Sequence, residues 1–325
     1  MNMQQLADVL NVSVSTISKA FSGSPEISEK TQKLIFSAAK KMGCYDKYCK
    51  RNFAKKVIAV ICPEFQIRYY SQHLTYLKKE IEKYNGIMVV GSYDFDGISQ
   101  KELLSYFTES AKVDGVIIIG SNNSKAKYNT PIVVIGHDEN LDSIWLSMKT
   151  AIKDAIECLV KNAHTDIAYI GEELTKNSFN NFAEAMIESN LKINDSYVIK
   201  SKERFEQAGY DGMNTLLALE KPPTAVLAAY DSIAIGAMKS IYEHGLKVPD
   251  DISIIGMDDS REAAYLSVPL ASITSYTEDL CQITVDLLFE RIEKGDINKI
   301  KRINVSTSFL NRNSVGKAKN SSDDD

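Results

Sequence analysis

Short apolar runs alternate with amphipathic stretches along most of the chain. Runs such as VIAVIC and VIIIG are typical of buried β-strands. They predict strands at Val57–Cys62, Ile87–Ser92, Val113–Gly120, Pro131–Gly136, Asp166–Gly171, Ser196–Lys200, Thr224–Tyr230 and Asp251–Met257. Between the strands, apolar residues recur at helical spacing, as at Leu74, Leu77 and Ile81. This spacing predicts helices at about 69–84, 99–111, 147–162, 178–190, 203–219, 231–244 and 277–294.

Buried strands that alternate with amphipathic helices indicate an α/β fold, in which parallel sheets are covered by helices on both faces. About 250 residues with this pattern suit two doubly wound lobes. Two later strand-like pieces, Ala271–Ser275 and Asn304–Leu310, suit chain crossings between the lobes.

The first 45 residues have a different pattern, which predicts three short helices. These are Gln4–Leu10, Val14–Phe21 and Glu29–Met42. Ser13 and Ser28 each stand where a hydroxyl caps the following helix, and Gly43 suits a left-handed C-terminal cap. Two short helices joined by a tight turn, with a third packed on them, make a helix-turn-helix unit. The alternative is a small three-helix bundle with no role in DNA binding.

Charge is divided unevenly between this head and the remainder of the chain. The 325 residues carry a formal net charge of −5. Residues 1–56 hold ten basic and four acidic residues, a net charge of +6, which leaves −11 for the other 269. A basic head on an acidic body suggests a polyanionic partner for the head. A solvated, lysine-rich helix followed by a linker is the alternative reading.

The head's sequence resembles the N-terminus of the lactose-repressor (LacI/GalR) family of bacterial transcription regulators. The resemblance is carried by LADVLNVSVSTISKAFSGSPEISEKTQKLIFSAAKKMGCY. The chain departs from the family pattern at Asn11, Lys19 and Ser22, where the family has Gly, Arg and Asn. Since lysine is a single-point donor and lacks the two-pronged fork of arginine, we expect softer base discrimination at Lys19.

The resemblance implies a set of DNA-binding residues in the head and in the hinge that follows it. Those expected to contact bases or phosphates are Ser13, Val14, Ser15, Thr16, Ser18, Lys19, Ser28, Thr31, Arg51 and Phe53. In the family a hinge helix inserts a leucine into the minor groove. Here the Pro-Asn pair of the hinge is missing, and either Phe53 or Ala54 stands near the leucine position.

The resemblance continues through the body to about residue 312 and implies a two-lobed fold like that of periplasmic sugar-binding proteins. We expect a head at 1–46, a hinge at 47–57, an effector domain at 58–312 and a disordered tail at 313–325. Within the effector domain, the N-lobe is expected at about 58–143 and 275–300. The C-lobe is expected at about 144–272 and 301–312.

Ligands of open α/β sheets bind at the carboxyl ends of the strands, so a small-molecule effector is expected in the cleft between the lobes. The expected contacts are Glu64, Tyr69, Tyr70, Tyr93, Asp94, Ser121, His137, Ser178, Tyr230 and Asp258. Several family positions are altered: Ser178 stands for the family's cleft arginine and Tyr230 for an asparagine. These departures make an ordinary hexose or pentose less favoured as the effector.

The remaining motifs exclude other classes of protein. There is no G-x-G-x-x-G after a strand, no P-loop and no G-x-S-x-G, and we predict neither an enzyme nor a cofactor. Five dispersed cysteines and four scattered histidines predict no metal site. The N-terminus lacks a signal-peptide pattern and no apolar run reaches membrane-spanning length, so a cytoplasmic protein is expected.

The sequence therefore predicts a homodimeric, DNA-binding transcription regulator, with the dimer built through helices such as 69–84 and 277–294. We interpret it as a repressor that reads a near-palindromic operator and that is controlled by a small molecule. The alternatives are a ligand-independent or activating regulator, or a free solute-binding protein.

Overall fold

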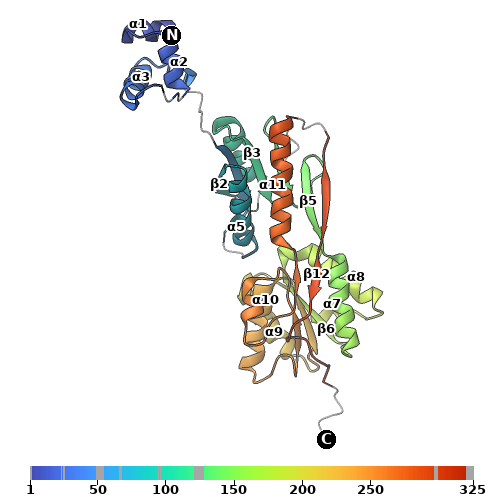
Figure 1. The fold of residues 1–325 in the computed structure, drawn as a ribbon. Helices are drawn as coiled ribbons and strands as arrows, with labels where there is room; N and C mark the ends of the chain where they lie inside the picture. Colours follow the sequence, from blue (N-terminus) through green and yellow to red (C-terminus); the bar gives the residue numbers. More distant parts are fainter. Residues whose placement is uncertain are drawn as a thin grey trace. The chain divides into compact units, whose positions relative to one another are not determined.

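The computed structural model describes residues 2–22, 24, 26–48, 55–65, 68–93, 95, 97–120, 128–295 and 299–319. The chain divides into two compact units, Met1–Lys56 and Val57–Asp325, which are described separately below (Figure 1). Arg51, Phe53, Ala54, Asp94 and Ser121, all named above, lie outside the described residues.

The described residues of the head form four helices around a small apolar core. They are α1 (Met3–Leu10), α2 (Val14–Phe21), α3 (Glu29–Lys41) and the short α4 (Tyr45–Tyr48). The first three confirm the predicted helices to within one residue at each end. The core is formed by Leu6, Ala7, Ile17, Ala20, Phe21, Ile35, Ala39 and Cys44.

Helix α4 extends the head beyond the expected boundary at residue 46. The rings of Tyr45 and Tyr48 each pack 6.0 Å from that of Phe21, and Tyr45 also meets Phe36 edge-on at 5.3 Å. Residues 47 and 48, expected in the hinge, therefore belong to the head, because these aromatic contacts pack α4 against the core.

The N-lobe is built on a six-stranded sheet with the order β11-β5-β4-β3-β1-β2. Its strands are β1 (Lys56–Cys62), β2 (Gly86–Ser92), β3 (Gly115–Ile119), β4 (Ile132–Ile135), β5 (Asp142–Ser147) and β11 (Arg302–Ser306). Helices α5 (Arg68–Lys83) and α11 (Thr277–Lys294) pack on one face. Helix α6 (Gly97–Ser105) and the π-helical turn Tyr106–Ser110 cover the other face.

The C-lobe repeats this plan with a four-stranded sheet, β7-β6-β8-β9. Its strands are β6 (Ile167–Glu172), β7 (Val198–Ser201), β8 (Ala225–Ala228) and β9 (Ser253–Ile255). Its helices are α7 (Lys149–Lys161), α8 (Lys176–Glu188), α9 (Phe205–Leu217) and α10 (Asp231–Glu243), with 3₁₀ turns at Glu173–Thr175, Asp195–Tyr197 and Arg261–Tyr265. Helices α7 and α8 lie on one face of the sheet, and α9 and α10 on the other (Figure 1).

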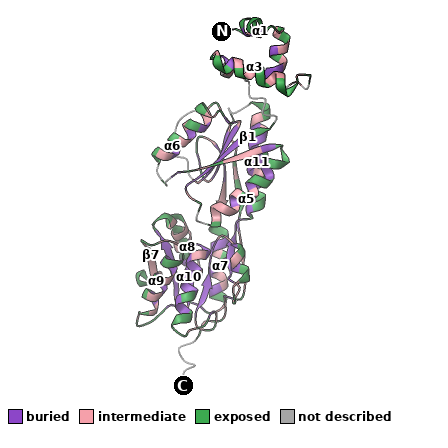
Figure 2. Ribbon diagram, turned by 90° about the vertical axis from the view of Figure 1, so that its left-hand side faces the viewer, coloured by how far each residue is buried: buried purple, intermediate pink, exposed green. Residues whose placement is uncertain are grey.

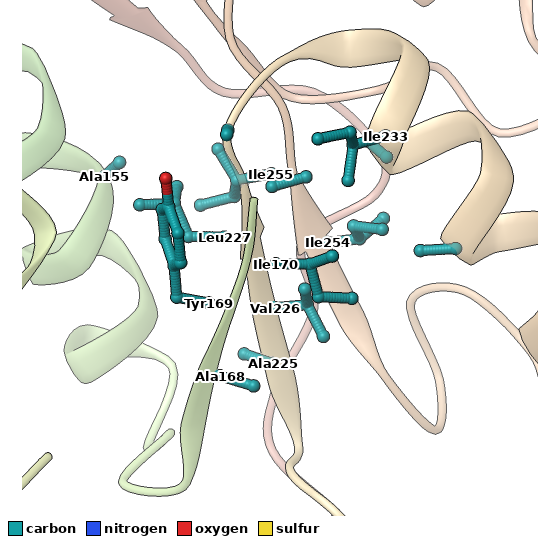
Figure 3. Packing of buried hydrophobic residues seen from close by; sticks show 14 of the residues in the cluster. Ala155, Ala168, Tyr169, Ile170, Ala225, Val226, Leu227, Ile233, Ile254 and Ile255 are labelled. Atoms are coloured by element: carbon teal, nitrogen blue, oxygen red, sulfur yellow. The ribbon is translucent and has the colours of Figure 1, made fainter. Parts of the chain in front are cut away.

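Strand alternation divides the C-lobe core into two layers. Tyr169, Leu227 and Ile255 are register partners and share the face toward α7, where Ala155 lies (Figure 3). Their chain neighbours, such as Ile170 and Ile254, face Ile233 of α10. Strands β6, β8 and β9 are buried on both faces, as Figure 2 shows, which explains why their sequences are largely apolar, whereas the edge strand β7 is only partly buried.

Helices α9 and α10 approach each other through two glycines. A side chain at Gly209 would overlap the carbonyl oxygen of Ile233, and one at Gly236 would overlap that of Glu206. The close approach therefore requires glycine at both positions.

Among the described residues, the chain crosses between the lobes three times, and two short strands next to these crossings pair with each other. The chain passes from β5 to α7, from β10 (Ser272–Thr274) to α11, and from β11 to β12 (Ser308–Leu310). Strands β10 and β12 pair antiparallel, with Ser272 opposite Leu310. At the third crossing, the hydroxyl of Thr307 donates to the carbonyl oxygen of Ser147 at 2.9 Å.

Two expectations about the lobes were wrong. Strand β5 was not predicted, and residues 144–147 and 302–306 were expected in the C-lobe, yet β5 and β11 pair in parallel within the N-lobe sheet. The first residues of β5 are polar, so the sequence did not show the apolar run that is typical of a buried strand. Asp142 is buried there because Arg291 of α11 donates to its two oxygens at 2.7 and 2.9 Å.

The described part of the expected disordered tail, residues 313–319, packs on the C-lobe instead. Ser314 is fully buried; its hydroxyl donates to the carbonyl oxygen of Ile254 at 2.6 Å and accepts from the amide of Ala271 at 2.8 Å. The Nε2 atom of His164 lies 3.1 Å from the carbonyl oxygen of Gly316. These distant partners hold a segment whose polar composition alone suggested disorder.

Within the described ranges, no helix is both long enough and apolar enough to cross a membrane. Among the same residues, no group of three or more His, Cys, Asp or Glu side chains is placed to hold a metal ion.

Candidate functional site

The second helix of the head presents a polar surface whose position is fixed by its caps. The hydroxyl of Ser13 accepts from the amide of Thr16 at 3.0 Å, and that of Ser28 accepts from the amide of Thr31 at 3.2 Å. Each serine hydroxyl also lies 2.8 Å from the hydroxyl of the same threonine. Both caps predicted from the sequence are therefore confirmed. The serine and threonine of each cap together place four hydroxyls at the starts of α2 and α3.

The side chains expected to meet DNA are accessible along α2. Ser13, Ser15, Ser18 and Ser28 are exposed, whereas Val14, Thr16, Lys19 and Thr31 are half-buried. Ile17, Ala20 and Phe21 turn inward and anchor the helix to the core. The polar face thus follows from the 3.6-residue period: the residues that hold α2 in place and those that face outward are interleaved.

Lys19 does not extend freely into solvent. Its ammonium forms an ion pair with Glu26 at 2.5 Å, with 43% and 66% of the two side chains exposed. The sequence pattern did not indicate this partner, since Glu26 lies seven residues further on, beyond the turn. Any contact of Lys19 with a base competes with this ion pair.

A second candidate site lies between the lobes of the body, and it consists of two cavities that share Tyr69. The first, which we call the tyrosine chamber, has a volume of about 350 Å³. It is lined by Pro63, Tyr69, Tyr70, Tyr93, Phe95, Gly120, Glu172, Leu174, Thr175, Arg204, Ala229, Tyr230 and Asp258. The second, the asparagine chamber, measures about 580 Å³ and is lined by Tyr69, Ile135, Gly136, His137, Ile144, Trp145, Leu146, Asn177, Asn180, Asn181 and Glu184.

Arg204 connects the two lobes at the tyrosine chamber. It stands at the start of α9 in the C-lobe and donates two hydrogen bonds, of 3.0 and 2.8 Å, to the carboxylate of Glu64 in the N-lobe. Its Nε donates to Glu172 at 3.2 Å. Phe95 and Phe205 flank the guanidinium, with ring centroids 5.2 and 4.6 Å away. We call the Glu64–Arg204 pair the interlobe latch.

Asp258 contributes a carboxyl group with an altered pKa to the chamber. Burial, together with charge repulsion from the nearby Asp231, raises its pKa to about 8. Burial also raises the pKa of Asp231, to about 6, against hydrogen bonds from Ser272 and Ser260 that lower it. The backbone at Asp258 has φ of +94°, which a non-glycine residue adopts only under strain.

The tyrosine hydroxyls of this chamber stay protonated at neutral pH. Burial raises the pKa of Tyr69, Tyr70 and Tyr230, and it raises that of Tyr93 to about 12. The hydroxyl oxygen of Tyr230 also accepts from the amide of Phe205 at 3.1 Å. The chamber therefore offers aromatic faces and neutral hydroxyls, with carboxyl groups and one guanidinium at its edge.

Most of the described effector residues expected from the sequence come together here. Tyr69, Tyr70, Tyr93, Tyr230 and Asp258 line the tyrosine chamber, and Glu64 reaches it through the latch. His137 lies in the asparagine chamber. Ser178 lines neither cavity, because its hydroxyl is directed to the sulfur of Met257 at 3.3 Å.

Several residues of the site were not anticipated. Arg204, Glu172, Trp145 and the three asparagines of α8 were absent from the predicted set. Arg204 follows strand β7, so the rule of ligand binding at carboxyl strand ends would have found it, had it been applied to this short edge strand.

Comparisons with known proteins agree with this architecture. Residues 156–315 match the family described as "Periplasmic binding protein-like domain". The chain is 27% identical to the probable HTH-type transcriptional repressor ExuR of Bacillus subtilis (strain 168), over 96% of this chain and 98% of that protein. It is 28% identical to the HTH-type transcriptional repressor PurR of Histophilus somni (strain 129Pt), over 93% and 95% of the two chains.

Among solved structures, a LacI family transcriptional regulator from Enterococcus faecium with bound ribose has the same fold. The TM-score is 0.73 at 23% identity, and the alignment covers 81% of this chain and all of that one.

Proposed function

We propose that this chain is a DNA-binding transcriptional repressor of the LacI/GalR family and that a small molecule controls it. Relatives named as HTH-type transcriptional repressors, which align with nearly its whole length, support the proposal. The observation that carries the proposal is the helix-turn-helix head, whose second helix is capped, anchored by three apolar residues and polar on its outer face. The head's net charge of +6 also favours binding to the negatively charged phosphates of DNA.

The two-lobed body supplies the control. Effector binding in the tyrosine chamber acts on both lobes at once, since Tyr69, Tyr70 and Tyr93 come from the N-lobe and Arg204, Tyr230 and Asp258 from the C-lobe. A ligand shifts the lobe equilibrium only by its difference in affinity for the two arrangements. We propose that this shift changes the affinity of the heads for DNA.

We further propose a homodimer that reads a near-palindromic operator, because a twofold protein presents its two heads to a twofold site. Helices α5 and α11 are the candidate interface. They pack side by side, with Tyr84 stacked on Phe289 at 4.3 Å and Lys79 bonded to Glu278 at 2.5 Å, and thus present one continuous surface.

The proposal is tested by selecting DNA sites from a random library with the purified chain. We expect a near-palindromic motif, lost when Ser15 and Lys19 are replaced together by alanine. The control is Lys202→Ala, an exposed lysine of the body, which should leave selection unchanged. Failure to recover any motif at low salt would contradict the DNA-binding function.

The repressor assignment is tested separately, with a reporter gene placed behind the selected site. Repression supports the proposal, whereas activation favours the alternative of an activating regulator.

A further inference from the structure

The Lys19–Glu26 ion pair puts a carboxylate beside a lysine that is expected to contact bases. Glu26 is exposed and Lys19 is half-buried, so both side chains are accessible from solvent. A carboxylate repels phosphate, and Glu26 therefore does not add to the affinity of the head for DNA in general. Its position beside Lys19 points instead to a role in the choice of base.

Local hydrogen bonds fold the turn between α2 and α3 so that Glu26 comes back to α2. The carbonyl oxygen of Lys19 accepts from the hydroxyl of Ser22 at 3.1 Å and from the amide of Ser24 at 3.0 Å. The amide of Glu26 donates to the hydroxyl of Ser24 at 3.4 Å. These bonds tie the residues before Glu26 to the residue whose ammonium it meets, so the ion pair follows from the fold of the turn.

We propose that Lys19 and Glu26 read one G·C base pair together, with the ammonium on guanine and the carboxylate on the amino group of the paired cytosine. Glu26 is thus a specificity-determining residue, which the sequence pattern did not indicate. The inference rests on the proposed DNA-binding function, and it names the base pair that the head selects at one position of each half-site.

The donors and acceptors of the ion pair match the major-groove edge of G·C. Guanine presents two acceptors there, N7 and O6, and cytosine presents its N4 amino donor beside them. An ammonium has three donors, so guanine is the base that uses all of them while Lys19 keeps its bond to Glu26. The carboxylate only accepts, which suits the cytosine amino group and opposes a keto oxygen in the same place.

The spacing of the two charged groups also fits this edge. In a G·C pair, N4 of cytosine donates to O6 of guanine, so these two atoms lie about 2.9 Å apart. The ammonium nitrogen of Lys19 and the carboxylate oxygen of Glu26 are 2.5 Å apart. Placed edge to edge, the two pairs of atoms form a closed ring of charge-assisted hydrogen bonds.

Glu26 compensates for the lysine that stands where the family has arginine. Lysine alone is a single-point donor on a flexible stem, and it lacks the fixed fork of arginine. The ion pair holds the ammonium in one place and leaves 43% of the Lys19 side chain exposed to a base. We therefore expect Glu26 to restore part of the discrimination that lysine alone lacks.

The test uses the full chain and the DNA site that it selects. The position that loses its preference in Lys19→Ala is the one that Lys19 contacts, and we expect guanine there. Fluorescence anisotropy then gives Kd for this site and for the same site with A·T at that position. The ratio of the two Kd values measures base discrimination separately from overall affinity.

Glu26→Gln should lower this ratio by about three- to tenfold, the effect of about one hydrogen bond. An amide both donates and accepts, so it suits either base pair, and it no longer holds the ammonium by charge. The gain in binding should therefore be larger at the A·T site than at the selected site. When Glu26→Gln is added to Lys19→Ala, the ratio should fall no further, because the two side chains act as one unit.

Glu29→Gln is the matched control. Glu29 is another exposed carboxylate of the head with a lysine partner, and it lies 3.6 Å from the ammonium of Lys33. Its replacement removes the same charge, so the two Kd values should change by the same factor and their ratio should equal that of the unmodified chain. Circular dichroism of each variant confirms the fold.

Two results would overturn the proposal. One is a base other than guanine at the position that Lys19→Ala affects. The other is a ratio that Glu26→Gln leaves unchanged, since Glu26 would then only compete with DNA for the ammonium. Either result overturns this inference alone, whereas failure of the unmodified chain to select any motif overturns the proposed DNA-binding function and this inference with it.

Discussion

The interlobe latch should set the balance between closed and open arrangements of the body. Replacing Glu64 by glutamine removes the charge that Arg204 reaches across the cleft, while Arg204 keeps its contact with Glu172. A second interlobe ion pair, Arg68–Glu262, offers a comparison, because it also joins the lobes but lies in more exposed surroundings. We expect the two pairs to differ in strength for that reason.

The magnitude follows from geometry and burial. The latch has two charge-assisted hydrogen bonds, with only 29% of Arg204 and 16% of Glu64 exposed. Such bonds contribute about 1.5–3 kcal/mol. Taking about 2 kcal/mol, Glu64→Gln should shift the lobes toward the open arrangement by about 30-fold. In Arg68–Glu262 the exposed fractions are 54% and 39%, so Arg68→Gln should cost under about 1 kcal/mol, or less than about fivefold.

The assay is single-molecule energy transfer between dyes on the two lobes. Lys101 of α6 and Lys192 after α8 are exposed positions suited to site-specific labels. The populations of high and low transfer efficiency give the equilibrium constant for each variant. The double variant Glu64→Gln, Arg204→Gln should shift it little beyond the single one, because the two side chains share one interaction.

One result would refute the reasoning. If Arg68→Gln opened the lobes as much as Glu64→Gln, burial would not determine the strength of these ion pairs. The latch would then stabilise the closed arrangement no more than the exposed Arg68–Glu262 pair does.

Three further predictions concern the head, the cleft and the C-lobe core. Glu26→Gln should free Lys19 and tighten DNA binding up to about fivefold, the strength of an exposed ion pair, measured by fluorescence anisotropy; weaker binding would contradict it. Because burial and Asp231 hold the pKa of Asp258 near 8, above the 3.8 of an exposed aspartate, its contribution to stability should fall as pH rises between these values. Asp258→Asn should therefore flatten the dependence of Tm on pH in this window, and an unchanged slope would speak against the assignment. Gly236→Ala should lower the free energy of unfolding by about 1–3 kcal/mol in urea titrations, because the methyl group would meet the α9 backbone; an unchanged midpoint would show that the helices can separate freely.

Periodicity predicted most of the secondary structure, for reasons visible in single elements. Leu77 and Ile81 share the buried face of α5, and the continuous apolar run of β3 reflects a strand covered on both sides. In the head, serines before each helix predicted both caps, since a cap is a local interaction between residues three apart.

The failures arose where a residue's role depends on a distant partner. Asp142 made β5 look like a loop, and its burial is explained by Arg291, 149 residues further on, and by the backbone amide of Lys301. Likewise, nothing beside Arg204 in the sequence indicates that Glu64 faces it across 140 residues. The asparagines of α8 are a third case, because an amide row becomes a cavity wall only when the N-lobe stands opposite it.

The late return of the chain through both lobes has a consequence for biosynthesis. Strand β11 completes the N-lobe sheet, whereas β12 and residues 313–319 complete the C-lobe. A nascent chain that has emerged only as far as residue 300 therefore has both lobes unfinished, with the edge of β5 and the β10 strand unpaired. Unpaired strand edges are templates for aggregation. We thus expect the synthesis of residues 300–319 to be the interval in which this protein depends most on chaperones.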